Sequence, residues 1–219
     1  AQAETKALDL GDLRRVLLGV VLLSLLAELI ITAILATRFW AAGDWCGTGL
    51  WRGAFHAVSA FNNAGFALFA DNLMGYVTDP TVTITIALAV IAGGIGFPVW
   101  LALRRDLFRP SRWSVHVKLT LVTTAALIVV GSAAFTAVEW DNAATLGPLS
   151  VPGRILAGFF AGVMPRTAGF NAIDYEHVHP EGLLITDMLM FVGGGSASTA
   201  GGIKVTTFAL LAMMAWAEM

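Results

Sequence analysis

The amino-acid sequence predicts an all-α membrane protein built from two tandem helix–pore loop–helix repeats, with re-entrant half-helices and a broken final inner helix. Three observations lead to this prediction: an apolar composition, long apolar runs, and shorter apolar segments between them. Hydrophobic residues make up 57% of the 219 residues and charged residues 13%, and the mean hydropathy is +0.77. A soluble domain of this size needs more surface charge, so the composition favours a polytopic membrane protein.

The three long runs cover residues 16–35, 82–103 and 119–138. Each has roughly 20 residues, which at about 1.5 Å per residue spans the hydrocarbon core of a bilayer. The sequence Thr78-Asp79-Pro80 before the second run is a typical helix start, with Asp as the cap and Pro in the first turn. A fourth run begins at residue 183, stops at 192 and resumes at 205, so each half is too short to span alone.

Two shorter apolar segments, 51–66 and 153–170, lie between the long runs. Their apolar parts have the length of re-entrant segments that enter the membrane and return to the same side. Amphipathic helices lying on the membrane surface are the alternative for both segments.

The distribution of basic residues predicts the orientation in the membrane. Five basic residues lie in 104–118 and three precede the first long run, whereas the other connections are acidic or neutral. Because positive residues stay inside, we expect residues 1–15 and 104–118 to be cytoplasmic, in the inner or plasma membrane. Both short segments then enter from the outside. Four tryptophans fall at the predicted outer boundaries, as in an interfacial aromatic belt: Trp40, Trp45, Trp51 and Trp140.

The two short segments resemble each other when they are aligned at an offset of 104 residues. The shared core is Ala-Gly-Phe, at 64–66 and 168–170, and it follows an apolar half-helix in both cases. Glycine permits unusual backbone angles, and the residues after such a half-helix can turn their carbonyl groups toward an axis. A ring of carbonyl oxygens can replace the hydration shell of a cation. Non-helical backbone at this depth must be buried in protein or line a wet cavity.

The motifs "FHAVSAFNNAGF", "MPRTAGFN" and "GGGSASTAGGIKVTTF" resemble the Trk/Ktr/HKT superfamily of potassium transporters, in its bacterial TrkH/KtrB branch. The resemblance implies four consecutive repeats around one pore, of which residues 1–110 would be the second and residues 111–219 the third. The first and fourth repeats would be absent. Because the sequence begins with Ala and a polar stretch, we expect it to start inside a longer protein.

The resemblance assigns a selectivity filter and a gate to particular residues. K⁺ would bind only at the filter, which consists of Asn63, Ala64, Gly65, Phe66, Thr167, Ala168, Gly169 and Phe170. A flexible loop that obstructs the pore would contain Gly193, Gly194, Gly195, Ser196, Ser198, Thr199, Gly201, Gly202 and Lys204.

The residue types of the stretch 193–204 agree with a gate. Glycines disfavour helix, and the hydroxyl groups and Lys204 need water or protein partners at membrane depth. A positive charge on Lys204 beneath a cation filter would also repel K⁺. A hinge between closely packed helices is the alternative.

The resemblance also implies partners: K⁺, the lipid bilayer, a second copy of the chain in a homodimer, and a cytoplasmic nucleotide-binding regulatory subunit similar to TrkA or KtrA. The leading functional hypothesis is therefore K⁺ transport. The alternative is a membrane scaffold of the same fold that does not conduct.

The composition and motifs argue against other classes of function. A net charge of −2 without a basic tract argues against nucleic acid. The stretch 193–204 is not a phosphate-binding loop, because Ile203 separates Gly202 from Lys204. No serine stands in a hydrolase motif, and His177 and His179 lack a third metal ligand nearby. We therefore expect neither enzyme activity nor a cofactor.

Four ionisable residues within the apolar segments need an explanation. We expect His56 to be a packed, hydrogen-bonded residue of the first half-helix. Glu28 and Asp187 are costly in lipid and are expected to face the interior of the bundle, with pairing to a neighbouring group as the expected role and a coupling-ion role as the alternative. Arg166 precedes the second filter core, so its charge must point away from the ion path and bind carbonyl or carboxylate oxygens.

Overall fold

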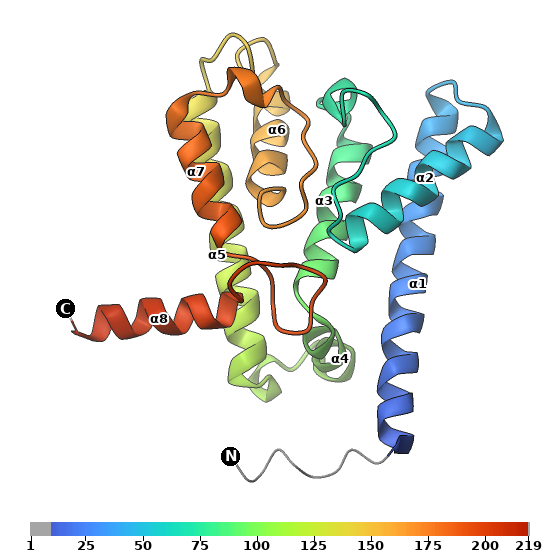
Figure 1. Ribbon diagram of the computed structural model, residues 1–219. Helices are drawn as coiled ribbons and strands as arrows, with labels where there is room; N and C mark the ends of the chain where they lie inside the picture. Colours follow the sequence, from blue (N-terminus) through green and yellow to red (C-terminus); the bar gives the residue numbers. More distant parts are fainter. Residues whose placement is uncertain (1–9, 219) are drawn as a thin grey trace.

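In the computed structural model, which describes residues 10–218, every regular element is a helix (Figure 1). A single isolated bridge pairs Val192 with Ile203. The eight α-helices are α1 Leu10–Ala41, α2 Cys46–Phe61, α3 Pro80–Gly94, α4 Phe97–Asp106, α5 Val115–Glu139, α6 Val151–Val163, α7 Pro180–Phe191 and α8 Val205–Glu218. Three short 3₁₀ helices cover Met74–Tyr76, Pro110–Arg112 and Tyr175–His177.

The helices form two similar units that lie side by side (Figure 1). In each unit a long helix, α1 or α5, leads into a half-helix, α2 or α6, and the chain then returns to the end from which the half-helix entered. An inner helix follows, α3 with α4 or α7 with α8. The described residues therefore contain twice the predicted order of a long helix, a half-helix with a returning chain, and an inner helix.

Glycines allow each half-helix to pack closely on the long helix of its own unit. A Cβ atom on Gly53 of α2 would lie 2.7 Å from the backbone nitrogen of Ala36 on α1. A Cβ atom on Gly162 of α6 would lie 2.6 Å from the backbone nitrogen of Ser132 on α5. Real Cβ atoms do not approach other atoms this closely, so both positions require glycine.

The long helices agree with two of the predicted spans. Residues 17–41 of α1 and all of α5, Val115–Glu139, are long and apolar enough to cross a membrane. They include almost all of the runs 16–35 and 119–138. The predicted start of α3 is also confirmed, because the Asp79 carboxylate accepts hydrogen bonds from the backbone N–H groups of Thr81 and Val82.

The prediction of one unbroken span over 82–103 was wrong. α3 ends at Gly94, α4 begins at Phe97, and the two helices meet at an angle of 97°. Gly96, at the N-cap of α4, has a φ of 91°, a left-handed conformation that glycine adopts without strain. Pro98 follows in the first turn of α4 and cannot supply the N–H that a continuous helix would need.

The final inner helix is broken as predicted, between Phe191 at the end of α7 and Val205 at the start of α8. α8 leaves the end of α7 almost sideways (Figure 1). Both inner helices are thus interrupted: the first by two residues, 95 and 96, and the second by residues 192–204. We call residues 193–204 the glycine loop.

The largest buried cluster joins the two units. It includes Phe39, Phe61 and Ile86 from the first unit together with Phe160 and Phe170 from the second. The stretches of chain that follow the two half-helices are also hydrogen bonded to each other, because the N–H of Leu73 donates to the carbonyl oxygen of Asn171 at 3.0 Å.

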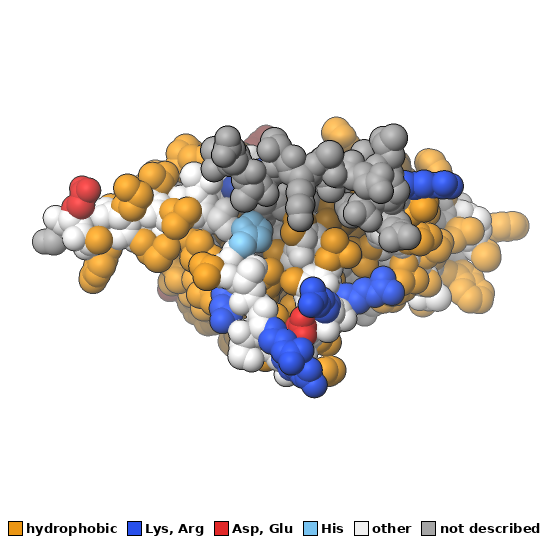
Figure 2. Space-filling model, turned by 90° about the horizontal axis from the view of Figure 1, so that it is seen from below, with side chains coloured by type: hydrophobic (Ala, Val, Ile, Leu, Met, Phe, Trp, Pro, Cys, Tyr) orange, Lys and Arg blue, Asp and Glu red, His pale blue; other side chains and the backbone are white. Residues whose placement is uncertain are grey.

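Basic residues gather at the end of the molecule that carries the connection between α4 and α5. Figure 2 shows Lys and Arg side chains grouped on this face. Arg105 and Arg112 lie 3.5 and 3.7 Å from the carboxylate of Asp106 and are largely exposed. The described part of the N-terminal helix begins at the same end (Figure 1).

Candidate ion-conduction site

The two half-helices end in short segments with matching backbone geometry. We call residues 63–66 the first return segment and residues 167–170 the second return segment. Asn63 and Gly65 have φ values of 52° and 76°, and Thr167 and Gly169 have values of 73° and 82°. The left-handed residues are therefore two apart in both segments and are related by the offset of 104 found in the sequence. Left-handed backbone at Asn63 and Thr167 is uncommon for residues with a Cβ atom.

The two return segments meet at their glycines. A Cβ atom on Gly65 would overlap the carbonyl oxygen of Ala168 and would lie 2.9 Å from the Cα atom of Gly169. A Cβ atom on Gly169 would lie 3.7 Å from the Cα atom of Gly65. The fold therefore brings together the two glycines that the sequence assigned to an ion filter.

Several carbonyl groups of the return segments are free of hydrogen bonds. Within residues 10–218, no donor is bonded to the carbonyl oxygens of residues 63–65 or 167–170. The carbonyl oxygen of Phe66 accepts a hydrogen bond from the Ser59 hydroxyl at 2.8 Å. Carbonyl oxygen atoms without a hydrogen-bond donor are suited to binding a cation.

His56 links the first half-helix to the stretches of chain that follow both half-helices. Its Nδ1 atom lies 2.7 Å from the carbonyl oxygen of Arg52, and its Nε2 atom accepts from the N–H of Leu68 at 3.4 Å. The ring is fully buried and stacks on Phe69 and Phe170, with centroid distances of 5.1 and 6.4 Å. The prediction of a packed, hydrogen-bonded histidine is confirmed.

The glycine loop contacts both half-helix ends. The Thr199 hydroxyl lies 3.1 Å from the carbonyl oxygen of Phe61 and 3.1 Å from Oδ1 of Asn63. On the other side, Nη2 of Arg166 donates to the carbonyl oxygen of Gly193 at 2.9 Å. Arg166 is 8% exposed, and its bond to a carbonyl confirms the kind of partner expected for it.

The glycine loop also packs into the break between α3 and α4. The N–H of Gly195 donates to the carbonyl oxygen of Gly94 at 2.8 Å, and the N–H of Thr199 donates to that of Gly93 at 3.3 Å. The N–H of Phe97 donates in turn to the carbonyl oxygen of Ala197 at 3.2 Å. The two interruptions therefore satisfy each other's backbone groups, as non-helical backbone at membrane depth requires.

Lys204 folds back onto the glycine loop. Its Nζ atom donates to the carbonyl oxygen of Ala200 at 2.8 Å, and the residue is half-buried. The positive charge predicted at the gate is therefore held against the loop itself.

Comparison with known proteins identifies the family of this chain. A family model described as "TrkH: Cation transport protein" matches residues 2–219. The chain belongs to the TrkH family. It is a membrane protein of a cation transport family, not of an enzyme family, in agreement with the sequence prediction.

Two similar proteins of the family are Ktr system potassium uptake proteins B. The one from Bacillus subtilis is 44% identical over 190 residues, which cover 87% of this chain and 42% of that protein. The one from Vibrio alginolyticus is 42% identical over 210 residues, which cover 94% of this chain and 45% of that protein. This chain thus spans less than half the length of these relatives.

The crystal structure of the potassium transporter TrkH from Vibrio parahaemolyticus has the same fold. The TM-score is 0.65 at 19% sequence identity, and the match covers 87% of this chain and 39% of that chain.

Two predicted intramembrane carboxylates differ in their surroundings. Glu28 on α1 is half-buried and accepts a hydrogen bond from Nδ2 of Asn62 at 2.8 Å, so it pairs with the end of the first half-helix. Asp187 on α7 is exposed, which contradicts the expectation that it faces the interior of this bundle. The reason is the packing of α7, which buries Gly182, Thr186 and Leu189 instead.

Sequence reasoning missed the buried carboxylate of Glu139 at the C-terminal end of α5. Glu139 is fully buried and accepts three hydrogen bonds, from Nδ2 of Asn142, the Thr145 hydroxyl and the N–H of His179, at 2.7, 2.6 and 2.9 Å. These bonds fix the connections on both sides of α6 and so position the second half-helix. A carboxylate at the end of an apolar run gives no sequence signal that separates it from a surface residue.

The other candidates do not form ion sites. In the described part of the chain, no cluster of three His, Cys, Asp or Glu side chains could hold a metal. Nδ1 of His177 lies 2.8 Å from the Asp174 carboxylate. Bonds from the N–H of Glu176 and from His177 hold the pKa of Asp174 below its usual value.

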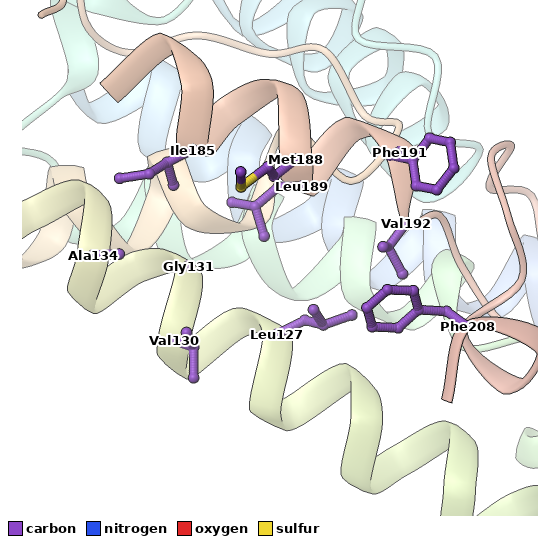
Figure 3. A pocket seen from close by; sticks show the side chains of 10 residues that line it. All are labelled: Leu127, Val130, Gly131, Ala134, Ile185, Met188, Leu189, Phe191, Val192 and Phe208. Atoms are coloured by element: carbon purple, nitrogen blue, oxygen red, sulfur yellow. The ribbon is translucent and has the colours of Figure 1, made fainter. Parts of the chain in front are cut away.

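A cavity of about 480 Å³ between α5, α7 and α8 is lined by apolar residues only (Figure 3). It therefore offers an ion no ligand. Its lining residues are Leu127, Val130, Gly131, Ala134, Ile185, Met188, Leu189, Phe191, Val192 and Phe208.

Proposed function

We propose that the protein is a K⁺-transporting pore subunit, with the two return segments as part of the selectivity filter and the glycine loop as the gate. One observation carries the proposal. Two segments with the same left-handed geometry and unpaired carbonyls meet at Gly65 and Gly169, and the glycine loop is bonded to the ends of the half-helices that carry them. This combination suits binding a dehydrated cation and obstructing its path.

Two features support K⁺ as the transported ion. Relatives at 42–44% identity are named potassium uptake proteins. The free oxygens are neutral carbonyls, which can replace a hydration shell without binding the ion too tightly to release it. K⁺ is the substrate in this proposal, at residues 63–66 and 167–170, and the chemistry needs no cofactor.

The repeat architecture supports a place for each unit in a longer protein. Residues 1–110 and 111–219 would be two of four repeats around one pore, because two return segments supply only part of a ring. The exposed side chain of Phe66 supports this arrangement: Phe66 is 69% exposed, whereas Phe170, at the matching position, is 2% exposed and packs on the preceding unit. A further repeat would cover Phe66 in the same way.

The charge distribution and the family resemblance support a proposed orientation and proposed partners. The basic end would face the cytoplasm, with residues 1–15 and 104–118 inside and the half-helices entering from outside. A homodimer bound to a cytoplasmic nucleotide-binding regulatory subunit is the assembly that the family resemblance implies.

The test is deletion of residues 196–201 in the full-length protein. The deletion should raise K⁺ uptake and reduce its dependence on the regulatory subunit, while the preference for K⁺ over Na⁺ stays the same. A Gly169→Ser variant is the matched comparison and should lower that preference without relieving the gate. Unchanged uptake in a deletion variant that reaches the membrane would make the loop a hinge. If the wild-type protein carries no ions, the non-conducting scaffold is the better description.

A further inference from the structure

Two side chains of the first half-helix hold the far end of the first return segment. The Ser59 hydroxyl donates to the carbonyl oxygen of Phe66 at 2.8 Å, and Nε2 of His56 accepts from the N–H of Leu68 at 3.4 Å. The half-helix also holds the near end, because the N–H of Ala64 donates to the carbonyl oxygen of Ser59 at 2.8 Å. The free carbonyls of the segment therefore belong to a short stretch of chain that is attached on both sides.

The contacts of His56 determine which ring nitrogen carries the proton. Nδ1 lies 2.7 Å from the carbonyl oxygen of Arg52, which can only accept, so Nδ1 is the protonated nitrogen. Nε2 of the neutral ring is then an acceptor, as the N–H of Leu68 requires. One ring in one tautomer therefore links a turn of the half-helix to the chain beyond the return segment.

The same ring contacts the second return segment. His56 is fully buried and stacks on Phe170, the last residue of that segment, with a centroid distance of 6.4 Å. It also stacks on Phe69 at 5.1 Å, and the guanidinium carbon of Arg52 lies 5.0 Å from the centre of the Phe69 ring. A change at position 56 therefore acts on both return segments.

The second half-helix has no counterpart of these two side chains. At the offset of 104 residues, Phe160 and Val163 stand in the places of His56 and Ser59, and both are buried side chains that offer no hydrogen bond. The second return segment ends instead in a buried side chain, Phe170. The first segment is therefore held by hydrogen bonds where the second is held by apolar contacts.

Resting on the proposed filter, we propose that His56 and Ser59 are positioning residues for K⁺ selectivity. They hold the first return segment at the distance from the second at which its free carbonyl oxygens suit K⁺ better than the smaller Na⁺. Neither side chain binds the ion, because His56 acts through the N–H of Leu68 and Ser59 acts through the carbonyl of Phe66. When either bond is lost, the carbonyls gain freedom to close around a smaller ion.

The experiment compares two substitutions of His56 in the full-length protein, with inhibition of K⁺ uptake by Na⁺ as the readout. Uptake is normalised to protein in the membrane. The amide group of Gln reaches about as far as Nε2, so His56→Gln retains an acceptor for Leu68. The amide group of Asn reaches only as far as Nδ1, so His56→Asn keeps a donor to Arg52 and loses the bond to Leu68.

The two substitutions of His56 should differ in ion preference. His56→Asn should lower the preference for K⁺ over Na⁺ by about two- to tenfold, the range that one neutral hydrogen bond spans. His56→Gln should stay closer to the wild-type preference. A role in folding alone would lower the amount of protein in the membrane and leave the preference of the remaining molecules unchanged.

Ser59→Ala tests the second attachment, and Ser132→Ala is its matched control. Ser59→Ala removes the donor to Phe66 and should also lower the K⁺ preference, so it tests the proposal if the substitutions of His56 do not reach the membrane. The Ser132 hydroxyl on α5 donates at 3.4 Å to the carbonyl oxygen of Phe159 in the second half-helix, not to a return segment. Ser132→Ala should leave the preference at the wild-type level.

Gly169→Ser, measured in parallel, separates these two residues from the filter itself. If Gly169→Ser lowers the K⁺ preference but His56→Asn and Ser59→Ala do not, neither side chain positions the segment, although the filter stands. Equal losses in His56→Gln and His56→Asn would overturn the role of His56, because ring packing would then explain them. A loss in Ser132→Ala as large as that in Ser59→Ala would overturn the role of Ser59. If no variant changes the preference, Gly169→Ser included, the filter itself is wrong.

Discussion

Gly93 on α3 lies directly against the carbonyl oxygen of Phe61, the last residue of the first half-helix. A Cβ atom on Gly93 would overlap this oxygen and would also lie 2.8 Å from the Thr199 hydroxyl. The inner helix, the half-helix and the glycine loop therefore meet at one point, which only glycine can occupy. A Cβ atom on the next residue, Gly94, would lie no closer than 3.6 Å to any neighbouring atom.

Gly93→Ala should disturb the first return segment, whereas Gly94→Ala should not. Overpacking at Gly93 is expected to cost about 1–3 kcal/mol. Gly94→Ala adds only ordinary contacts and removes some backbone freedom of the unfolded chain, so it should be neutral or slightly stabilising. Thermal unfolding of the full-length protein in detergent checks both values. Equal unfolding midpoints for the two variants would contradict the close approach.

The two return glycines should respond unequally to substitution. Gly65→Ser and Gly169→Ser both force a side chain into left-handed backbone, at a cost of roughly 1–2 kcal/mol. Gly65→Ser also drives its Cβ atom into the carbonyl oxygen of Ala168, whereas Gly169→Ser meets only Gly65 at ordinary contact distance.

We therefore expect both serine variants to show weaker discrimination of K⁺ over Na⁺, and Gly65→Ser to show lower expression as well. Competition of Na⁺ with K⁺ uptake, normalised to protein in the membrane, gives the comparison. If both variants discriminate K⁺ from Na⁺ as well as the wild-type protein does, the two return segments are not the selectivity filter.

Asp79, at the start of α3, acts both as a helix cap and as a partner of an ion pair, and two variants distinguish these contributions to stability. The Asp79 carboxylate caps α3, and its Oδ2 atom lies 2.7 Å from Nε of Arg38 on α1. Asp79→Asn keeps a good cap and loses the charge, so it should cost at most about 1 kcal/mol. Asp79→Ala loses both and should cost about 1 kcal/mol more. Unfolding measurements on both variants give the two contributions, and an equal loss would show that the cap contributes nothing.

The sequence predicted the broken final helix but not the broken α3–α4 pair, for a physical reason. Residues 193–204 include hydroxyl groups and a lysine, which are costly in lipid and therefore visible in a hydropathy pattern. The first break occurs in "IAGGIGFPVW", where every side chain is apolar or absent, so hydropathy alone reads it as a continuous span. The local signals of a break were Pro98 and the glycines at 93, 94 and 96.

The left-handed residues of the return segments were predictable only in part. Glycine at 65 and 169 suggests such a conformation, and both glycines adopt it. Asn63 gives a weaker signal, because asparagine is enriched in this region among residues with a Cβ atom, whereas Thr167 gives none, because its side chain is β-branched. Their conformation depends on the end of the preceding half-helix. There the backbone N–H of Asn63 donates to the carbonyl oxygen of Ala60, and the backbone N–H of Thr167 donates to that of Pro165. These contacts are set by the fold.

Glu139→Gln should destabilise the second unit where α5 ends. The amide nitrogen of Gln cannot accept a hydrogen bond, so at least one of the donors from Asn142, Thr145 and His179 loses its partner in a buried site. Leaving such a donor unsatisfied costs about 1–3 kcal/mol. The unfolding midpoint of the full-length protein should fall accordingly.

Asp141→Asn, two residues further on, is the matched control for Glu139→Gln. The Asp141 side chain is 95% exposed, and its nearest cation, Nη1 of Arg154, is 3.9 Å away. Its substitution should change stability by no more than about 0.5 kcal/mol. Because Glu139 holds the connections on both sides of α6, Glu139→Gln should also lower K⁺ uptake per molecule in the membrane, while Asp141→Asn should not. Equal effects of the two variants on stability would show that Glu139 is not buried among its three donors in the membrane.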